Sequence, residues 1–534
     1  MKYPKSIILP TVVVSAALLI VLNCSRSNLE VAGTTNRESR PPIIHPDYSG
    51  TVIPPNIAPL NFVVVDPGSG YNVKIYSTRG DTIRIASRSP KITIPLKAWK
   101  KTLDSNRGEP LCFDIRVRDE NGDWHIFEPI TNEISDADID EYLTYRRIKP
   151  LYNFWRDIHI HQRNLTNFNE SLVLSNKGIE KGCCNCHTFL NKKSDVMLMH
   201  TRSSLGVAML LIRDGEVTGI NSRTPLGAPI AYSSWHPSGR LIAFSVNRVK
   251  QFFHSAGKEI RDVIDLDSSL GIYSVDTNTI ADAAPELSKI DRMETYPMWS
   301  PDGRYLYFCA ADMIWSEEEK VYSDKNVTFP KGYKDVRYDL MRIGYDIDSD
   351  TWGELEKVLS SDETGKSITQ PKISPDGRHV LFCMADYGCF PIFQPSCDLY
   401  MMDIDTGSYQ PLEGNSDKCD SWHSWSHNSR WIVFSSKRGD GLYARPHISY
   451  VDSNGRTSKP FILPQKDPEM YDTLLDTFNV PELSVSPIDV RRRQLYHANA
   501  HLIPIEGIDI AVTAATPQLP SGEKSDVEIS PEKQ

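Results

Sequence analysis

The sequence predicts a mainly β protein, in which a β-propeller of about five to seven blades follows a small β-sandwich and a short helical connector. Two observations support this prediction. Four segments between residues 235 and 434 repeat one strand–turn–strand pattern. Upstream of them, apolar and polar residues alternate in short runs that are separated by turn residues. The 534 residues suffice for two or three domains.

Residues 1–24 are expected to be a lipoprotein signal peptide. Lys2 and Lys5 precede an almost wholly apolar run from Ile7 to Leu22. This run is shorter than the roughly 20 residues that a stable membrane span needs. Residues 21–24 resemble a bacterial lipobox, so we expect Cys24 to become the lipidated first residue of the mature chain. An uncleaved N-terminal anchor is the alternative, and either one would tether an exported protein to a membrane.

The expected location is therefore the periplasm, the outer membrane or the cell surface. A net charge of -10 and the lack of a long basic run make nucleic acid an unexpected partner. A hydrolase domain after the propeller is also disfavoured. Only a short stretch of chain follows residue 465, and it contains no G-x-S-x-G motif.

The segments before the repeats have distinct compositions. Residues 25–47 are polar and proline-containing, which predicts a flexible tether. Residues 48–130 are expected to form the β-sandwich, with apolar alternation at Val73/Ile75 and Ile83/Ile85. Residues 131–190 are expected to be a helical connector, because Ser135 could cap a helix that buries Leu143. Residues 513–534 are expected to be a disordered polar tail.

The repeats predict the blades of the propeller, which we place at residues 191–512. Each repeat reads as two strands joined by a tight turn, and a second hairpin signal follows it. Two hairpins make a four-stranded sheet, which is one propeller blade. A degenerate blade is expected at about 190–225, and a closing strand within 480–512. The four repeats are 235–244, 299–308, 373–382 and 425–434.

These segments resemble the TolB-like propeller repeat, with its W-S-P-D-G-x-x-I-x-F core. The order of lipobox, β-domain, Cys-x-Asn-Cys-His-x-Phe motif and blades is similar to a family of exported bacterial lipoproteins. That resemblance implies the fold and the compartment. It implies no established activity.

Residues 183–187 contain C-x-x-C-H, the attachment sequence for c-type haem. Cys183 and Cys186 could add to the vinyl groups of one covalent haem c, and His187 could ligate its iron. His200 is the preferred sixth ligand, because the resembling family carries His-x-Arg at this place. Other residues that could supply the ligand are His159, His161, Met197 and Met199.

Other roles for the cysteine cluster stay open. A zinc site is the weaker alternative, because no second C-x-x-C supplies the remaining ligands. A local disulfide or free thiols are further alternatives. Downstream, Cys389 and Cys397 could close a short loop by a disulfide, or they could be buried free thiols.

The spacing of the repeats predicts a binding face. Their starts lie 64, 74 and 52 residues apart, whereas an uninterrupted blade needs about 40–45 residues. The extra residues fall at about 246–268, 310–338 and 384–397, between the second and third strands, so they should gather on one face. The candidate binding residues in these insertions are His254, Asp262, Asp265, Asp267, Tyr387 and Phe390.

Three functions remain in view. The first is electron transfer by one c-type haem between partners docked on the propeller. The second is a non-enzymatic binding or scaffold protein with a structural cysteine cluster and no haem. The third is an enzyme that acts at an open haem site. The sequence favours the first, because it contains the attachment motif and no second redox centre.

Overall fold

The structure is a computed structural model that describes residues 35–149, 157–224, 229–254, 261–287, 289, 291–316 and 331–509. The expected signal peptide with Cys24 and the expected tail at 513–534 lie outside these residues. Two compact units are formed: residues up to Asp138 together with Pro464–Thr473, and the remainder. In the described part of the chain, no helix is long and apolar enough to cross a membrane.

The first unit is a β-sandwich. Its larger sheet is built around β8 (Pro110–Arg118), which pairs with β5 (Gly70–Tyr76), β9 (Trp124–Ile126) and β10 (Ile130–Ile134). The smaller sheet has the order β2 (Ile44–His45), β4 (Phe62–Val64), β7 (Lys91–Ile92). Phe62 and Phe113 join the two sheets, with ring centroids 6.1 Å apart. The remaining elements are β1 (Thr35–Arg37), β3 (Val52–Ile53), β6 (Ile83–Ser87), α2 (Leu96–Asp104) and α5 (Met470–Thr473).

The predicted tether at 25–47 is wrong for its described part. Residues 35–37 and 44–45 are strands, and Ile44 is buried. Arg40 forms an ion pair with Asp66, which fixes the chain between these strands. The polar, proline-containing composition therefore reflects edge strands with exposed side chains rather than a free linker.

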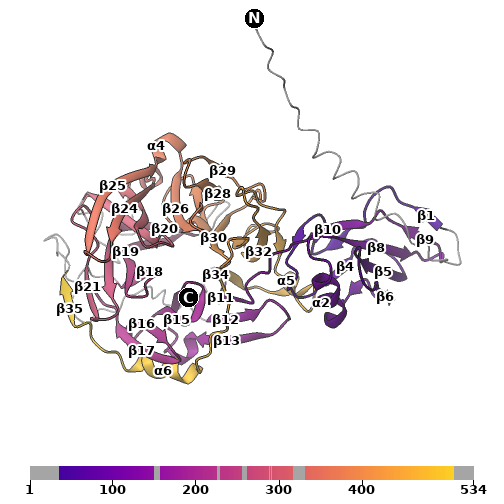
Figure 1. Cartoon of the computed structure of the whole chain (residues 1–534), viewed down its shortest axis with the longest axis horizontal. Coiled ribbons are helices and arrows are strands. Elements are labelled where there is room, and N and C mark those ends of the chain that lie inside the picture. Colours follow the sequence, from indigo (N-terminus) through magenta and orange to yellow (C-terminus); the bar gives the residue numbers. More distant parts are fainter. Residues whose placement is uncertain are drawn as a thin grey trace, which may run out of the picture. The chain divides into compact units, whose positions relative to one another are not determined.

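The second unit is a β-propeller. In its described residues, six sheets are arranged in a ring, five of them with four strands and one with a fifth strand added at its outer edge (Figure 1). We number the blades I to VI in the order in which their outer strands follow the chain. Blade I is β34-β11-β12-β13, blade II is β14–β17, blade III is β18–β21, blade IV is β22–β25, blade V is β26–β29 and blade VI is β30–β33.

The inner strands, which begin each blade, are β34 (Thr477–Ser484), β14 (Cys183–Leu190), β18 (Ile230–Trp235), β22 (Arg292–Trp299), β26 (Ser367–Ile373) and β30 (Asp420–Trp425). The second strands are β11 (Tyr142–Ile148), β15 (Lys193–Ser203), β19 (Leu241–Phe253), β23 (Tyr305–Asp312), β27 (His379–Ala385) and β31 (Trp431–Ser436). The third strands are β12 (Ile158–Asn164), β16 (Gly206–Arg213), β20 (Arg261–Ser274), β24 (Asp339–Asp346), β28 (Asp398–Asp403) and β32 (Arg445–Tyr450).

The outer strands are β13 (Glu170–Ser175), β17 (Glu216–Asn221), β21 (Thr279–Asp282), β25 (Thr351–Leu359), β29 (Tyr409–Pro411) and β33 (Phe461–Ile462). Near the C-terminus, α6 (Arg492–Ala500) contacts β16 and β17. Strand β35 (Gly507–Asp509) then extends blade III by parallel pairing with β21. Three short helices lie in connecting segments: α4 (Ser361–Thr364), η3 (Tyr333–Asp335) and η4 (Pro391–Phe393).

The two ends of the propeller sequence close its ring. The late strand β34 pairs antiparallel with the early strand β11, and the two lie side by side in Figure 1. Just before β34, Asp476 accepts hydrogen bonds from Arg147 and from Lys149, each over 2.6 Å. The closing strand therefore comes from residues 477–484, which begin before the predicted 480–512 range and overlap its start.

The predicted helical connector at 131–190 is wrong where the structure describes it. Strands β10 to β14 occupy this segment, and β11 to β13 build blade I. Leu143, Thr144 and Tyr145 are all fully buried, as in a strand that is covered on both of its faces. Pairing of β11 with strands on both sides outweighs the weak capping signal that favoured a helix.

The repeated turns owe their sequence to one hydrogen-bond pattern. In blade IV, Ser300 donates to Asp302 over 2.6 Å, and the backbone N–H of Tyr305 donates to the Ser300 hydroxyl over 3.0 Å. Blades V and VI repeat this pattern. The hydroxyl of Ser374 donates to Asp376 and that of Ser426 donates to Asn428, each over 2.6 Å. The turn thus fixes the register between the inner and second strands.

Five of the six inner strands, all but β14, share a feature that their sequences did not predict. Tyr232, Tyr296, Gln370, Trp422 and Val480 all have positive φ, between 46° and 55°. Each lies where the pairing with the second strand shifts register. A non-glycine residue in this conformation costs about 1–3 kcal/mol of folding free energy. The packing around the five bulges must therefore offset a repeated cost in stability.

Candidate functional site

The insertions lie where the repeat spacing predicts, between the second and third strands of blades III, IV and V. In blade III, β19 and β20 are elongated and pair as far as Phe253 and Arg261. In blade IV the insertion runs from 313 to 338, of which 313–316 and 331–338 are described. In blade V it spans 386–397. We call the surface that the described residues of these three insertions form the insertion face.

Hydrogen bonds tie the insertions to one another. The Tyr387 hydroxyl of blade V donates to Asp262 of blade III over 2.7 Å, and Gln394 Nε2 donates to the same carboxylate over 3.3 Å. The backbone N–H of Gly388 donates to the carbonyl of Val336 over 2.9 Å, which joins the insertions of blades V and IV. The described parts of the three insertions are therefore packed against one another.

An aromatic cluster closes the centre of the ring beneath the insertion face. The ring centroids of Tyr232 and Tyr296 lie 4.5 Å apart, and those of Tyr232 and Trp422 lie 6.2 Å apart. Because blades III and VI are opposite in a ring of six, Tyr232 and Trp422 meet across its axis. Phe390 packs on Tyr232 at 6.4 Å, and Tyr296 donates its hydroxyl to the carbonyl of Cys389 over 2.7 Å. The strained inner-strand residues thus support the insertions.

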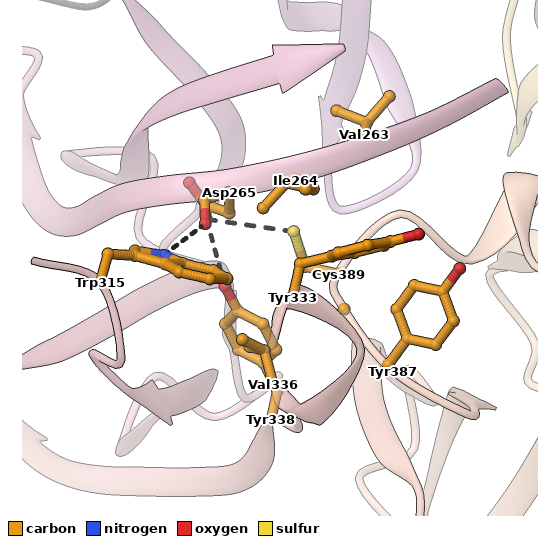
Figure 2. A pocket seen from close by; sticks show the side chains of 10 residues that line it. Val263, Ile264, Asp265, Trp315, Tyr333, Val336, Tyr338, Tyr387 and Cys389 are labelled. Carbon is orange, nitrogen blue, oxygen red and sulfur yellow. Dashed lines mark hydrogen bonds between the residues drawn. The ribbon is translucent and has the colours of Figure 1, made fainter. Parts of the chain in front are cut away.

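A pocket lies where the three insertions meet (Figure 2). Its empty space is about 240 Å³, part of it open to solvent. Asp265 lies at its inner end and is 4% exposed. Asn247 and Tyr338 donate to Asp265 Oδ2 over 2.8 and 3.3 Å, and the Cys389 thiol lies 4.0 Å from the same oxygen. Trp315 Nε1 donates to the backbone carbonyl of Asp265 over 3.2 Å.

Burial dominates the electrostatics of this pocket. Burial raises the pKa of Asp265 to about 7, although Asn247 and Tyr338 donate hydrogen bonds to it. Burial likewise raises the pKa of Asp262, despite the hydrogen bond from Tyr387. Both carboxyl groups therefore lie where a negative charge is poorly compensated.

The predicted face residues are brought together in part. His254 Nε2 lies 3.7 Å from Asp262 Oδ2, so these two join Tyr387 in one cluster. Asp265 lines the pocket beside them. Asp267 pairs instead with Arg248, at 3.7 Å between Oδ2 and Nη1. Phe390 belongs to the aromatic cluster below.

The C-x-x-C-H residues take an unexpected place. Cys183–Leu190 is the inner strand β14, paired with β15 through a register shift between Cys184 and His187. Cys184, which the motif leaves without a role, is fully buried in the core between blades I and II. Cys186 and His187 are also buried, and burial lowers the pKa of His187 to about 4.

His187 and His200 lie on opposite faces of blade II. His187 pairs with Met199, which packs in the cluster that contains blade I residues. Leu198 faces the other way, into the cluster with blade III, and His200 shares its face. His200 Nε2 lies 2.9 Å from the Ser233 hydroxyl of β18. The predicted pair cannot sandwich one haem in this arrangement.

A metal ion held by protein side chains alone would need a cluster of ligands. Among the described residues, no group of three or more His, Cys, Asp or Glu side chains is arranged to hold a metal ion. A haem iron takes four ligands from its porphyrin, so this finding does not bear on haem. The placement of His187 and His200 on opposite faces of blade II is what does not fit a haem that both would ligate. The zinc alternative finds no complete ligand set there either.

The downstream cysteines are free thiols. Cys389 and Cys397 are both buried and unpaired, so the predicted short-loop disulfide is wrong and its alternative holds. Cys397 lies in the core cluster with Cys383 and Cys419. Burial raises the pKa of Cys397, which keeps its thiol protonated and unreactive.

Several site residues escaped the sequence analysis. Tyr232, Tyr296 and Trp422 each stand three positions before the first residue of a repeat. This fixed offset from the repeats is the feature of the sequence that could have identified them. Tyr333 and Tyr338, which line the pocket, had no comparable signal, because they lie in an insertion without an internal repeat.

Comparisons with known proteins give little beyond this geometry. No family model and no curated protein match the sequence. A nidogen/laminin complex structure is similar at 10% identity, over 65% of this chain and 99% of that chain, with a TM-score of 0.36. A mutant apocarotenoid oxygenase from Synechocystis is similar at 11% identity, over 81% of this chain and 95% of that chain, with a TM-score of 0.35. The Dos1 propeller is similar at 10% identity, over 53% of this chain and 65% of that chain, with a TM-score of 0.31. The strand order itself identifies the second unit as a six-bladed β-propeller.

Proposed function

We propose that this protein is a non-enzymatic binding propeller that docks a protein partner on its insertion face. One observation carries the proposal: insertions from three blades are bonded into a single surface over one end of the ring. Tyr387 bonds to Asp262 across blades, and Tyr296 bonds from the inner strand to the insertion of blade V. Insertions that gather on one face of a propeller often mark its binding surface.

The chemistry of the face supports binding. Tyr333 and Tyr387 are half-buried, with ring centroids 5.6 Å apart, and Arg261 lies 4.1 Å above the ring of Phe393. Tyrosine and arginine are enriched at protein interfaces, because each combines apolar area with directed polar contacts. Electron transfer finds no such support, because His187 and His200, the two expected haem ligands, lie on opposite faces of blade II.

A partner-capture experiment tests the proposal. The tagged full chain is crosslinked in its source cells and purified beside two variants. Tyr333→Ala with Lys334→Ala alters the insertion face, whereas Tyr409→Ala alters a tyrosine that is 40% exposed on the outer strand of blade V. We expect one partner to be recovered with the wild type and with Tyr409→Ala, and to be lost from the double variant. Equal recovery from both variants would overturn the proposal.

We also propose that the propeller works outside the cytoplasm, tethered to a membrane through a lipid on Cys24. The support is the pattern of residues 1–24, a short positive segment followed by an apolar run that ends at a cysteine. Intact-mass spectrometry of the membrane fraction should detect a lipidated chain that begins at Cys24. A Cys24→Ala variant that keeps the same mass shift and membrane association would contradict it.

A further inference from the structure

We propose that the axis of the propeller binds a small monovalent anion of the size of chloride, at the end opposite the insertion face. Lys372, next to last in the inner strand β26, and Lys192, in the turn between β14 and β15, would hold this anion. The insertions leave from the other end of the blades, where the inner strands begin. The site is therefore separate from the docking surface and does not depend on the proposed function.

Lys192 reaches the axis of the ring. It belongs to blade II, but its Nζ donates to the Ser424 hydroxyl of blade VI over 3.1 Å and lies 3.5 Å from Glu482 Oε1 of blade I. Blades II and VI are not neighbours in the ring, because blade I lies between them. An ammonium group that contacts both blades I and VI from blade II therefore lies close to the centre.

Lys372 approaches the same place from blade V, which is opposite blade II in a ring of six. Lys372 and Ser424 are each next to last in the inner strands of neighbouring blades, so they lie at the same level along the axis. Burial lowers the pKa of Lys372, the charge of Glu482 opposes this effect, and the charge of Lys192 lowers the pKa further. The two lysines are thus near enough to repel each other.

The Lys372 ammonium group makes no hydrogen bond. Within the described part of the chain, its Nζ is joined to no other residue by a hydrogen bond or an ion pair. An ammonium group has three N–H donors and no acceptor. Because the Lys372 side chain is half-buried, the protein displaces part of the water around it and supplies no acceptor in return.

The charges at this end of the axis do not balance. Glu482 supplies a negative charge that acts on Lys372, but its carboxylate already lies 3.5 Å from Lys192. Two ammonium groups therefore share one carboxylate, and each disfavours the charge of the other. A buried charge without a counter-charge is costly. An anion between the two lysines would offset both the burial and the repulsion.

The donors indicate the kind of anion. Lys192 uses two of its three N–H groups on Ser424 and Glu482, whereas Lys372 uses none. A monatomic anion accepts N–H groups from any direction, so it needs no matched arrangement of donors. A water molecule accepts the same hydrogen bonds, but it carries no charge and leaves the repulsion in place. Lys192 and Glu482 are only 19% and 14% exposed, which disfavours a large organic anion.

The test is the line width of the chloride NMR signal in the presence of the full chain. Chloride that exchanges with a protein site shows excess broadening, and bromide competes for the same site. We expect broadening with the wild type that bromide removes and that the larger gluconate ion leaves in place at equal ionic strength. Lys372→Met keeps the length of the side chain without its charge, and it should weaken chloride binding by about tenfold or more.

Lys193→Met is the matched control, because Lys193 is exposed directly beside Lys192 and should leave the broadening unchanged. If Lys372→Met fails to fold, Lys192→Met still decides the question, because Lys192 lies in a turn and its loss should also weaken chloride. An absence of excess broadening with the wild type, or equal broadening in the wild type and both site variants, would overturn the inference. Displacement by gluconate as effective as that by bromide would overturn the assigned size of the anion.

Discussion

The hydroxyl of Tyr387 donates a hydrogen bond to the buried carboxyl group of Asp262 over 2.7 Å, across 125 positions of the chain. This contact joins the insertions of blades V and III. Tyr387→Phe removes the donor and leaves Asp262 less well satisfied. We expect a loss of about 1–2 kcal/mol, concentrated in the insertions.

Hydrogen exchange measures that loss locally. Amides of 261–268 and 386–397 should exchange faster in Tyr387→Phe than in the wild type, while the inner strands keep their protection. Tyr409→Phe is the matched control on the outer strand of blade V. Uniformly faster exchange throughout the propeller would show that the contact supports the whole fold and not the insertion face.

Ring closure depends on Asp476. Burial alone would raise the pKa of Asp476, but hydrogen bonds from Lys149 and Arg147 outweigh it and lower that pKa. Its stabilising contribution is thus present above the unfolded pKa and is lost as pH falls through the folded one. Asp476→Asn should cost about 1–3 kcal/mol in urea unfolding at pH 7. The difference from wild type should shrink at pH 3, and a difference independent of pH would contradict this origin.

A histidine in the repeated turn of blade VI should give the opposite pH dependence. The side-chain hydrogen bond to Asp140 raises the pKa of His427, despite a smaller opposing effect of burial. The contribution is complete below the unfolded pKa of about 6.5 and is lost as pH rises through the folded one. Because half of the His427 side chain is exposed, we expect less than about 1 kcal/mol.

Thermal unfolding of His427→Gln tests this dependence. Its melting temperature should fall below that of wild type at pH 6 and approach it at pH 9, with His501→Gln as an exposed control. A deficit that grows toward pH 9 would show that the charge of His427 does not stabilise the turn.

The cysteine motif should behave as part of a folded strand. Expressed with the machinery for c-type haem maturation, the native chain should show no covalent haem on a denaturing gel. The reason is that Cys186 and His187 are buried in β14 and that His200 faces the other blade. Haem staining that disappears in Cys183→Ala/Cys186→Ala would contradict the placement of the motif.

The repeats predicted the propeller and the position of its insertions, because turn residues act locally. The Ser300–Asp302 bond lies within one turn, so its residues are visible in the sequence. Blade I was missed, because β11 is a strand through its pairing with β34, more than 300 residues later. Long-range pairing leaves no local signal.

The candidate site shows the same division between what local sequence predicts and what long-range contacts decide. Asp262 and Tyr387 could be named from the excess length of the insertions, but their bond to each other could not. The motif at 183–187 predicted a pair of haem ligands that the structure does not bring together, because C-x-x-C-H is defined by residue types, whereas its use depends on which way each side chain faces. Burial of Cys184 between two blades decided that direction.

The most direct test of the account is site-specific photo-crosslinking in the source cells. A photoreactive phenylalanine analogue replaces Tyr333 on the insertion face or, in a separate chain, Tyr409 on the outer strand of blade V. We predict one discrete protein adduct from position 333 and none from position 409. An adduct from position 409 alone, or the same adduct from both positions, would contradict docking on the insertion face.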